Sequence, residues 1–170
     1  PIACASSSST PTSAGIPELE DLSMGNQDQS CEVQAVVDWY GPTDFLKMDE
    51  QLAESGLPIQ PDQRHNGPNS PESLLLGQTI TEIPEKVRAA NPEAYIRPDS
   101  PPFLLQHGTH DCVVPVQQSK NFASKLIQVL GKDKVVLELL QGAEHADPMF
   151  ETPENVKKVL DFLDAHLKIR

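Results

Sequence analysis

Residues 102–115 read PFLLQHGTHDCVVP, an apolar run that ends in a loop carrying Asp111. A second apolar run opens residues 135–145, VVLELLQGAEH, and its loop carries His145. Short apolar runs bounded by turn residues are typical of buried strands. An acid followed by a histidine, each just past the C-terminal end of successive strands, matches the last two members of a Ser–Asp–His relay. Asp111 and His145 are therefore the candidate catalytic residues.

The regular part of the chain predicts a parallel sheet covered by helices. Three strands are expected, at residues 33–39, 103–107 and 134–140. Apolar residues recur near a helical period in residues 116–130 and again in residues 153–167. Strands that alternate with helices and are apolar on both faces favour an α/β fold with a parallel sheet. Ligand sites of such sheets lie outside the carboxyl ends of the strands, where Asp111 and His145 fall.

The remaining segments suggest how the chain is organised. Residues 1–30 read as a flexible or remnant N-terminal segment, and residues 31–170 read as one partial α/β domain. Within that domain, residues 49–100 are punctuated by prolines and predict short helices that begin near Ser70 and near Pro84. A long connection of low regularity is usually functional, so we interpret 49–100 as a cap or lid-like insertion.

Composition limits the class of protein. A chain of 170 residues is long enough for one domain with its own core. A net charge of -12 argues against nucleic acid or an anionic membrane as a partner. No run resembles a membrane span or a secretory leader, so a cytoplasmic protein is favoured over a secreted one, with the segment before Pro1 unknown. The three cysteines are widely spaced and odd in number, which favours free thiols over disulfides or a zinc site.

Three motifs in the right order carry a family resemblance. They are Val33–Asp44 with its Tyr40-Gly41-Pro42-Thr43-Asp44 ending, Pro101–Pro115 with Asp111, and Gly142–His145. Together they resemble the C-terminal half of an α/β-hydrolase, over roughly residues 16–168. The resemblance is greatest to the esterase and lipase branch that contains acetyl-ester and feruloyl-ester hydrolases and the prolyl-oligopeptidase-like peptidases.

This resemblance implies both the fold and the chemistry. It implies the C-terminal portion of an α/β-hydrolase fold, with Asp111 as the acid and His145 as the general base of a Ser–Asp–His triad. It also implies that Tyr40 and Val114 contact the substrate, a small-molecule ester, and that no cofactor is needed. The implied activity is that of a serine hydrolase acting on short acyl esters. Peptide bonds stay open as substrates, because acyl and amide chemistry share the relay.

Structural alternatives exist for both candidate residues. Asp111 is also placed to cap the helix expected at 116–130, and His145 to be a surface histidine bonded to Glu144 or Asp147.

A metal site is a further alternative. His107, His110, Asp111 and His145 are of the types that bind a metal through nitrogen and oxygen. However, His107 ends a strand and resembles a structural histidine of the family, and His110 lies in a turn. We therefore predict no metal at this site.

The nucleophile is missing from the pattern. The elbow of this fold reads Gly-x-Ser-x-Gly between a strand and a helix, and the only partial match is Ser13, in Pro11-Thr12-Ser13-Ala14-Gly15. Proline replaces the first glycine, no apolar strand precedes it and Pro17 follows. The interpretation we favour places the nucleophile upstream of Pro1, so that this chain alone is inactive. The alternative is a catalytically inactive remnant that serves as a binding or assembly module.

The first predicted strand raises the question of partners. In the family the strand at 33–39 pairs on its other side with the nucleophile strand. An unpaired apolar edge invites pairing with another chain. We therefore expect this chain to associate with its own N-terminal half or with a second copy of itself.

Overall fold

The computed structural model describes residue 23, residues 33–59 and residues 64–167. The N-terminal segment predicted at 1–30 lies outside the described residues except at position 23, and so does the candidate nucleophile Ser13. Cys4 and Cys31 also lie outside them, and Cys112 is a free thiol.

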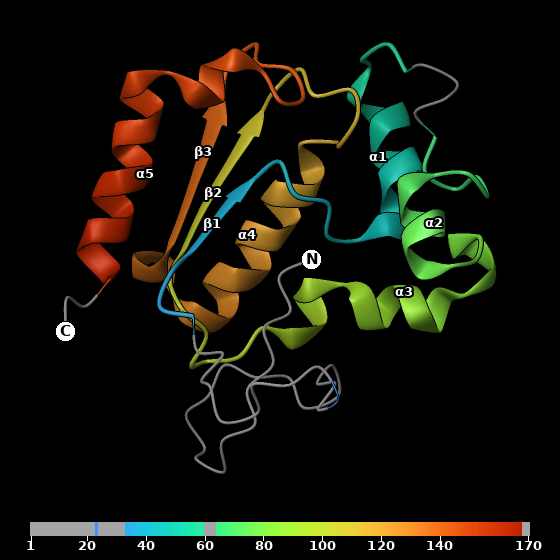
Figure 1. The fold of residues 1–170 in the computed structure, drawn as a ribbon, viewed down its shortest axis with the longest axis horizontal. Coiled ribbons are helices and arrows are strands. Elements are labelled where there is room, and N and C mark those ends of the chain that lie inside the picture. Colours follow the sequence, from blue (N-terminus) through green and yellow to red (C-terminus); the bar gives the residue numbers. More distant parts are fainter. Residues whose placement is uncertain (1–22, 24–32, 60–63, 168–170) are drawn as a thin grey trace.

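The predicted sheet is present as three parallel strands. They are β1 (Val36–Trp39), β2 (Phe103–Gly108) and β3 (Val135–Leu140), in the order β1-β2-β3 (Figure 1). The first strand begins at Val36 rather than at the predicted residue 33. Its neighbour β2 starts only after Pro101 and Pro102, which have no N–H to donate to a ladder. Because all three strands are parallel, their carboxyl ends meet at one edge.

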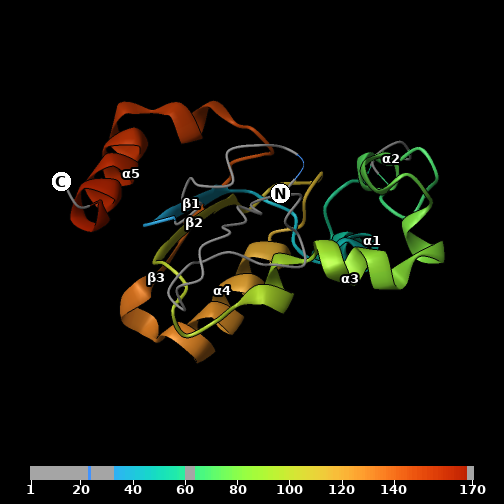
Figure 2. The ribbon, with the colours of Figure 1, turned by 60° about the horizontal axis from the view of Figure 1, so that its bottom comes forward.

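Two long helices cover opposite faces of this sheet (Figure 2). They are α4 (Gln117–Leu130), which leads from β2 to β3 through η7 (Lys132–Lys134), and α5 (Pro153–His166), which follows η8 (Pro148–Glu151). Gly131 ends α4 with a φ of 84°, and the Thr152 hydroxyl caps α5 by accepting from the Asn155 amide. No helix within the described residues is long and apolar enough to cross a bilayer.

The main core lies between β2 and α4. It consists of the buried side chains Leu105, Phe122, Ala123, Leu126 and Val135. We expected strands buried on both faces, and this is right for β2, in which five consecutive residues from Leu104 are buried. It is wrong for β3, where Val136 is 42% exposed. β3 is an outer strand, which the two helices cover less completely.

A pair of buried amides ties α5 to the central strand. Gln106 Nε2 donates to Asn155 Oδ1 at 2.8 Å, and Asn155 Nδ2 donates back to Gln106 Oε1 at 3.0 Å. Both side chains are buried, and a buried amide is costly unless its donors and acceptors are paired. The pairing therefore specifies how α5 sits on the sheet.

The insertion forms a small helical unit beside the sheet (Figure 1). The unit begins before the predicted residue 49, with η3 (Phe45–Lys47) and α1 (Met48–Ser55), and continues with α2 (Pro71–Leu76), η5 (Ile80–Glu82), α3 (Pro84–Ala90) and η6 (Pro92–Tyr95). The helix predicted near Ser70 is confirmed, with the Ser70 hydroxyl accepting from the Ser73 amide. A second buried cluster holds the unit together: Phe45, Met48, Ile80, Val87 and Val114. Because Val114 belongs to the loop after β2, the insertion is anchored there, and its cap or lid role stays a prediction.

Gly108 allows the loops after β2 and β3 to touch. A Cβ atom at this position would lie 2.3 Å from the Ala143 carbonyl oxygen. The contact is reinforced on both sides, because Thr109 N donates to the Leu140 carbonyl and His110 N donates to the Ala143 carbonyl. The close approach of these backbones therefore requires glycine.

Replacing Gly108 by alanine tests this requirement. We expect Gly108→Ala to lower the free energy of unfolding by about 2–3 kcal/mol, because the new methyl group forces two hydrogen-bonded backbones apart. The matched control is Gly67→Ala, where the added Cβ meets nothing within 4 Å. Urea denaturation of both variants measures the difference. Equal stability of the two would show that the loops do not meet as described.

Candidate active site

Asp111 and His145 meet at the carboxyl ends of the strands. His145 Nδ1 lies 2.8 Å from Asp111 Oδ2, although the two residues follow different strands and are 34 positions apart. Asp111 does not cap α4, since its carboxylate bonds to the loop at Val113 and Val114. His145 is bonded to Asp111 rather than to Glu144 or Asp147. The structure thus brings together the two residues that the sequence singled out.

The carboxylate of Asp111 is buried and held on both oxygens. Oδ1 accepts from the amides of Val113 and Val114, at 2.9 and 2.8 Å. Oδ2 faces His145 and also lies 3.3 Å from His107 Nε2. Burial alone would raise the pKa of Asp111, but the two histidines and the backbone amides lower it to about 2. The carboxylate is therefore ionised at neutral pH and fixed in orientation.

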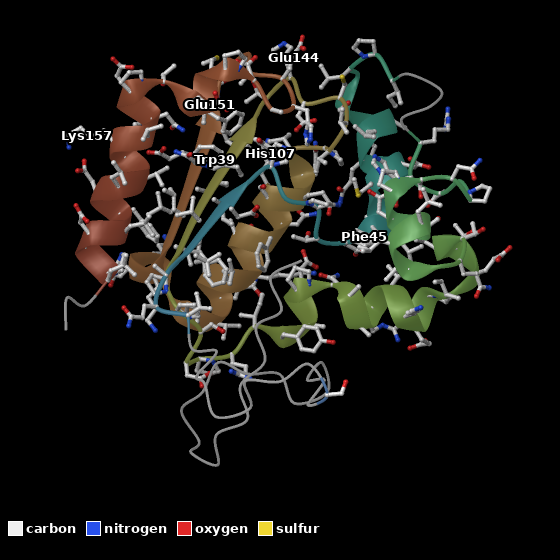
Figure 3. All side chains as sticks on the ribbon, viewed as in Figure 1. Trp39, Phe45, His107, Glu144, Glu151 and Lys157 are labelled. Atoms are coloured by element: carbon white, nitrogen blue, oxygen red, sulfur yellow. The ribbon has the colours of Figure 1, made fainter. Side chains whose placement is uncertain are left out.

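His107 is a buried structural histidine, as the sequence predicts. Its Nε2 lies 2.9 Å from the Val114 carbonyl, which only accepts, so Nε2 carries a proton. Its Nδ1 lies 2.7 Å from the Ser119 hydroxyl, which can donate. These partners fit a neutral ring. Figure 3 shows His107 where β2 ends, near the loop that carries Glu144.

Among the described residues, the side chains proposed for the metal-site alternative are not arranged to bind a metal ion together. Both ring nitrogens of His107 are occupied, and His110 is exposed. The described residues contain no set of three or more His, Cys, Asp or Glu side chains placed to hold a metal ion.

Aromatic rings support the ring of His145. Tyr40, directly after β1, packs edge-on against His145 with ring centroids 4.7 Å apart, and Phe150 packs against Tyr40 at the same distance. Tyr40 has a φ of 46° and Ala146 a φ of 54°, conformations that are uncommon outside glycine and concentrate at functional sites. The side chain of His145 is 31% exposed. Among the described residues, none hydrogen-bonds to its Nε2.

The two predicted substrate-contacting residues differ in placement. Tyr40 lies against His145, beside its ring. Val114 is 5% exposed, with its side chain in the core of the insertion, so its backbone rather than its side chain faces the acid. Substrate contact by either residue stays a prediction.

Several residues that shape the site have no signal in the sequence. Gln118 of α4 is buried, and its Oε1 accepts from the amides of Thr43 and Asp44, so it fixes the loop after β1. His65 and Glu72, inside the insertion, form a buried pair that contacts the acid loop. A polar residue in an apolar run, such as Gln106, indicates that a partner is needed, but not which one.

Known proteins similar to this chain include esterases. The sequence matches the BD-FAE family over residues 11–126. It is 32% identical to the probable carboxylic ester hydrolase LipM of Mycobacterium tuberculosis, over 72% of this chain and 26% of that protein, and 39% identical to the esterase LipC of the same organism, over 44% and 18%. A solved structure, a truncated form of a carbohydrate esterase from gut microbiota, is similar with a TM-score of 0.67 and 29% identity, over 83% of this chain and 45% of that one. The chain thus spans about a quarter of LipM and less than half of the solved esterase.

The low pKa of Asp111 predicts how stability depends on pH. Because the folded-state pKa of about 2 lies below the usual 3.8, the carboxylate stabilises the fold above about pH 4, and the contribution is lost as the pH falls toward 2. We expect Asp111→Asn to reduce the free energy of unfolding by about 2 kcal/mol at pH 7 and by about half of that near pH 3.

Urea denaturation at several pH values measures this difference. The control is Asp133→Asn, which changes an exposed carboxylate in η7, before β3. It should leave the dependence of the free energy of unfolding on pH unchanged. If the free energies of unfolding of Asp111→Asn and of the unmodified protein differed by the same amount from pH 7 to pH 3, this would contradict the lowered pKa of Asp111.

Proposed function

The chain belongs to the BD-FAE family, and we propose that it supplies the acid and the base of a serine carboxylic-ester hydrolase. Asp111 is the acid and His145 the general base. The observation that carries the proposal is the 2.8 Å contact from His145 Nδ1 to an ionised, buried carboxylate whose other oxygen is already held by two amides.

The geometry suits general-base catalysis. The carboxylate of Asp111 accepts from Nδ1 and so keeps the proton there, which leaves the lone pair on Nε2. Nε2 then takes the hydroxyl proton of a serine as that oxygen attacks the ester carbonyl, and the resulting imidazolium is stabilised by Asp111. The same nitrogen returns the proton to the leaving alcohol, and water repeats the sequence on the acyl-enzyme.

The nucleophile is expected beside β1. His145 follows β3, yet its ring reaches past the end of β2 to touch Tyr40 at the end of β1. Within the described residues, β1 pairs only with β2, so its other edge is open. A strand added at that edge would end about 5 Å from β1, within reach of His145. A serine in a Gly-x-Ser-x-Gly turn after such a strand completes the triad.

Short acyl esters are the proposed substrates. The relatives named as esterases and the neighbour named as a carbohydrate esterase favour ester over peptide bonds. We expect the insertion, which is anchored at Val114, to border the acyl group. We expect no hydrolysis by this chain alone, because the described residues offer no nucleophile beside His145. The alternative is an inactive binding or assembly module, which the experiments below distinguish.

Substitution of His145 tests the proposed relay. In an esterase-active form of the protein, His145→Ala should lower kcat/KM for p-nitrophenyl acetate by about a thousandfold or more, because the general base is lost. His110→Ala, which changes an exposed histidine of the neighbouring loop, should leave the rate unchanged. An undiminished rate in His145→Ala contradicts the proposal. Loss of activity in His110→Ala and on addition of a chelator would favour a metal-dependent hydrolase.

Labelling with a fluorophosphonate locates the nucleophile. The reagent phosphonylates an activated serine, and peptide mass mapping then identifies the residue. We expect the label on a serine of an upstream Gly-x-Ser-x-Gly segment, and none on this chain by itself. A label on Ser13 would make this chain self-sufficient. The absence of both labelling and hydrolysis in every form of the protein would favour the inactive module.

The open edge of β1 predicts association. Val36 N donates to the Pro102 carbonyl, just before β2, and Tyr40 N to the Gln106 carbonyl in β2, so the alternation along the strand directs the N–H of Val37 to the open edge. If the N-terminal half is absent, we expect a dimer or larger species by light scattering, and Val37→Pro should shift it toward monomer because proline cannot donate there. Val129→Ser, at an exposed position of α4, is the control. A monodisperse monomer at high concentration argues against edge pairing.

A further inference from the structure

A second histidine–carboxylate pair lies behind the acid loop, inside the insertion. His65 is 3% exposed, and its Nδ1 lies 3.0 Å from Glu72 Oε1. Its Nε2 lies 2.8 Å from the carbonyl oxygen of Val113. Glu72 is 6% exposed and belongs to α2. The ring of His65 therefore bridges the insertion and the loop that follows β2.

The partners of His65 indicate its charge. A peptide carbonyl only accepts, so Nε2 carries a proton, and a lone pair on Nδ1 would face a carboxylate oxygen at 3.0 Å. Nδ1 lies within ion-pair distance of this carboxylate but is not aligned for a hydrogen bond with it, so the neighbouring charge is what favours the imidazolium. His107 shows the contrast, since its Nδ1 faces a hydroxyl that can donate. The two buried histidines thus differ in the group that their Nδ1 atoms face.

One peptide unit joins His65 to Asp111. The carbonyl of Val113, which accepts from His65, and the amide of Val114, which donates to Asp111 Oδ1 at 2.8 Å, belong to the same planar unit. A donor on the carbonyl polarises the unit and strengthens its N–H as a donor. It also fixes the plane of the peptide and hence the direction of that N–H. The chain of contacts runs from Glu72 through His65 and this peptide to Asp111.

We propose that His65 is a positioning residue for the acid: held by Glu72, it orients the Val113–Val114 peptide so that the Val114 amide keeps the Asp111 carboxylate directed at His145. This role rests on the proposed function of Asp111 and His145. His65 itself touches neither substrate nor nucleophile. The insertion thereby contributes to the acid loop through a specific contact as well as through the packing of Val114.

The charged groups around His65 determine the pKa of its ring. Besides Glu72, the carboxylate of Asp49 on α1 accepts from the backbone amides of His65 and Asn66. Burial lowers the pKa of His65, but Glu72, the Val113 carbonyl and Asp49 outweigh it, so the pKa lies above the usual 6.5. The hold on the acid loop is therefore complete below about pH 6.5 and weakens as the pH rises through this raised value, because the neutral ring keeps only one N–H to donate.

Hydrogen exchange tests the proposal without needing activity. In the unmodified chain the amides of Val113 and Val114 should be protected, and His65→Gln should speed their exchange about tenfold, relative to intrinsic rates. His110→Gln, an exposed histidine of the same loop, is the matched control. Because His65→Gln leaves the charge of Glu72 buried, the double variant His65→Gln/Glu72→Gln serves as a second test free of that charge.

The pH dependence and the kinetics separate positioning from general stability. Protection of Val114 should fall as the pH rises, with a midpoint that moves to lower pH in Glu72→Gln. In an esterase-active form, the double variant should lower kcat about tenfold and change KM little. Unchanged exchange at Val113 and Val114 in both His65 variants would overturn the proposal, as would nitrogen chemical shifts of a neutral His65 ring at pH 6. An undiminished rate in His145→Ala would reject the esterase function. The exchange results would still test independently whether His65 orients the Val113–Val114 peptide.

Discussion

The buried carboxylate of Asp111 is the interaction on which the arrangement of this protein depends. Two backbone amides hold one oxygen, and His145 and His107 face the other. These contacts come from three parts of the chain: the acid loop itself, the central strand and the loop after β3. A buried carboxylate is tolerated only with such compensation, so the fold and the candidate site are stabilised by the same contacts. Removing any one partner weakens both.

Close approach of backbones makes these contacts possible. Gly108 lets the loop after β3 lie directly against the end of β2, and the hydrogen bonds of Thr109 and His110 hold it there. From this position His145 reaches Asp111 on one side and Tyr40 on the other. The insertion contributes from behind, through the side chain of Val114 and the His65 contact to Val113. The acid loop thus lies between the loop after β3 and the insertion, two segments that are distant from each other in sequence.

The predictable features are those that depend on local pattern. Apolar runs ended by turn residues located β2 and β3, and the proline that opens α5 and the glycine that follows α4 marked their ends. The start of β1 was misplaced because strand length depends on the neighbour, and Pro101 and Pro102 shorten that neighbour's ladder. The exposure of Val136 was missed for a similar reason, since periodicity does not say how completely helices cover an outer strand.

The sequence by itself determined the α/β class, the strand and helix order, and the identity of Asp111 and His145, because these follow from short-range periodicity and from motifs at strand ends. Only the tertiary structure decided which partners the buried polar groups would find. Asn155 lies 49 positions from Gln106, and His65 contacts a carbonyl 48 positions away. Such pairings are set by how the helices pack on the sheet, and nothing in the local pattern around His65 or Asn155 specifies a partner. The partners of His65 and of Asp111 are therefore found only in the folded chain.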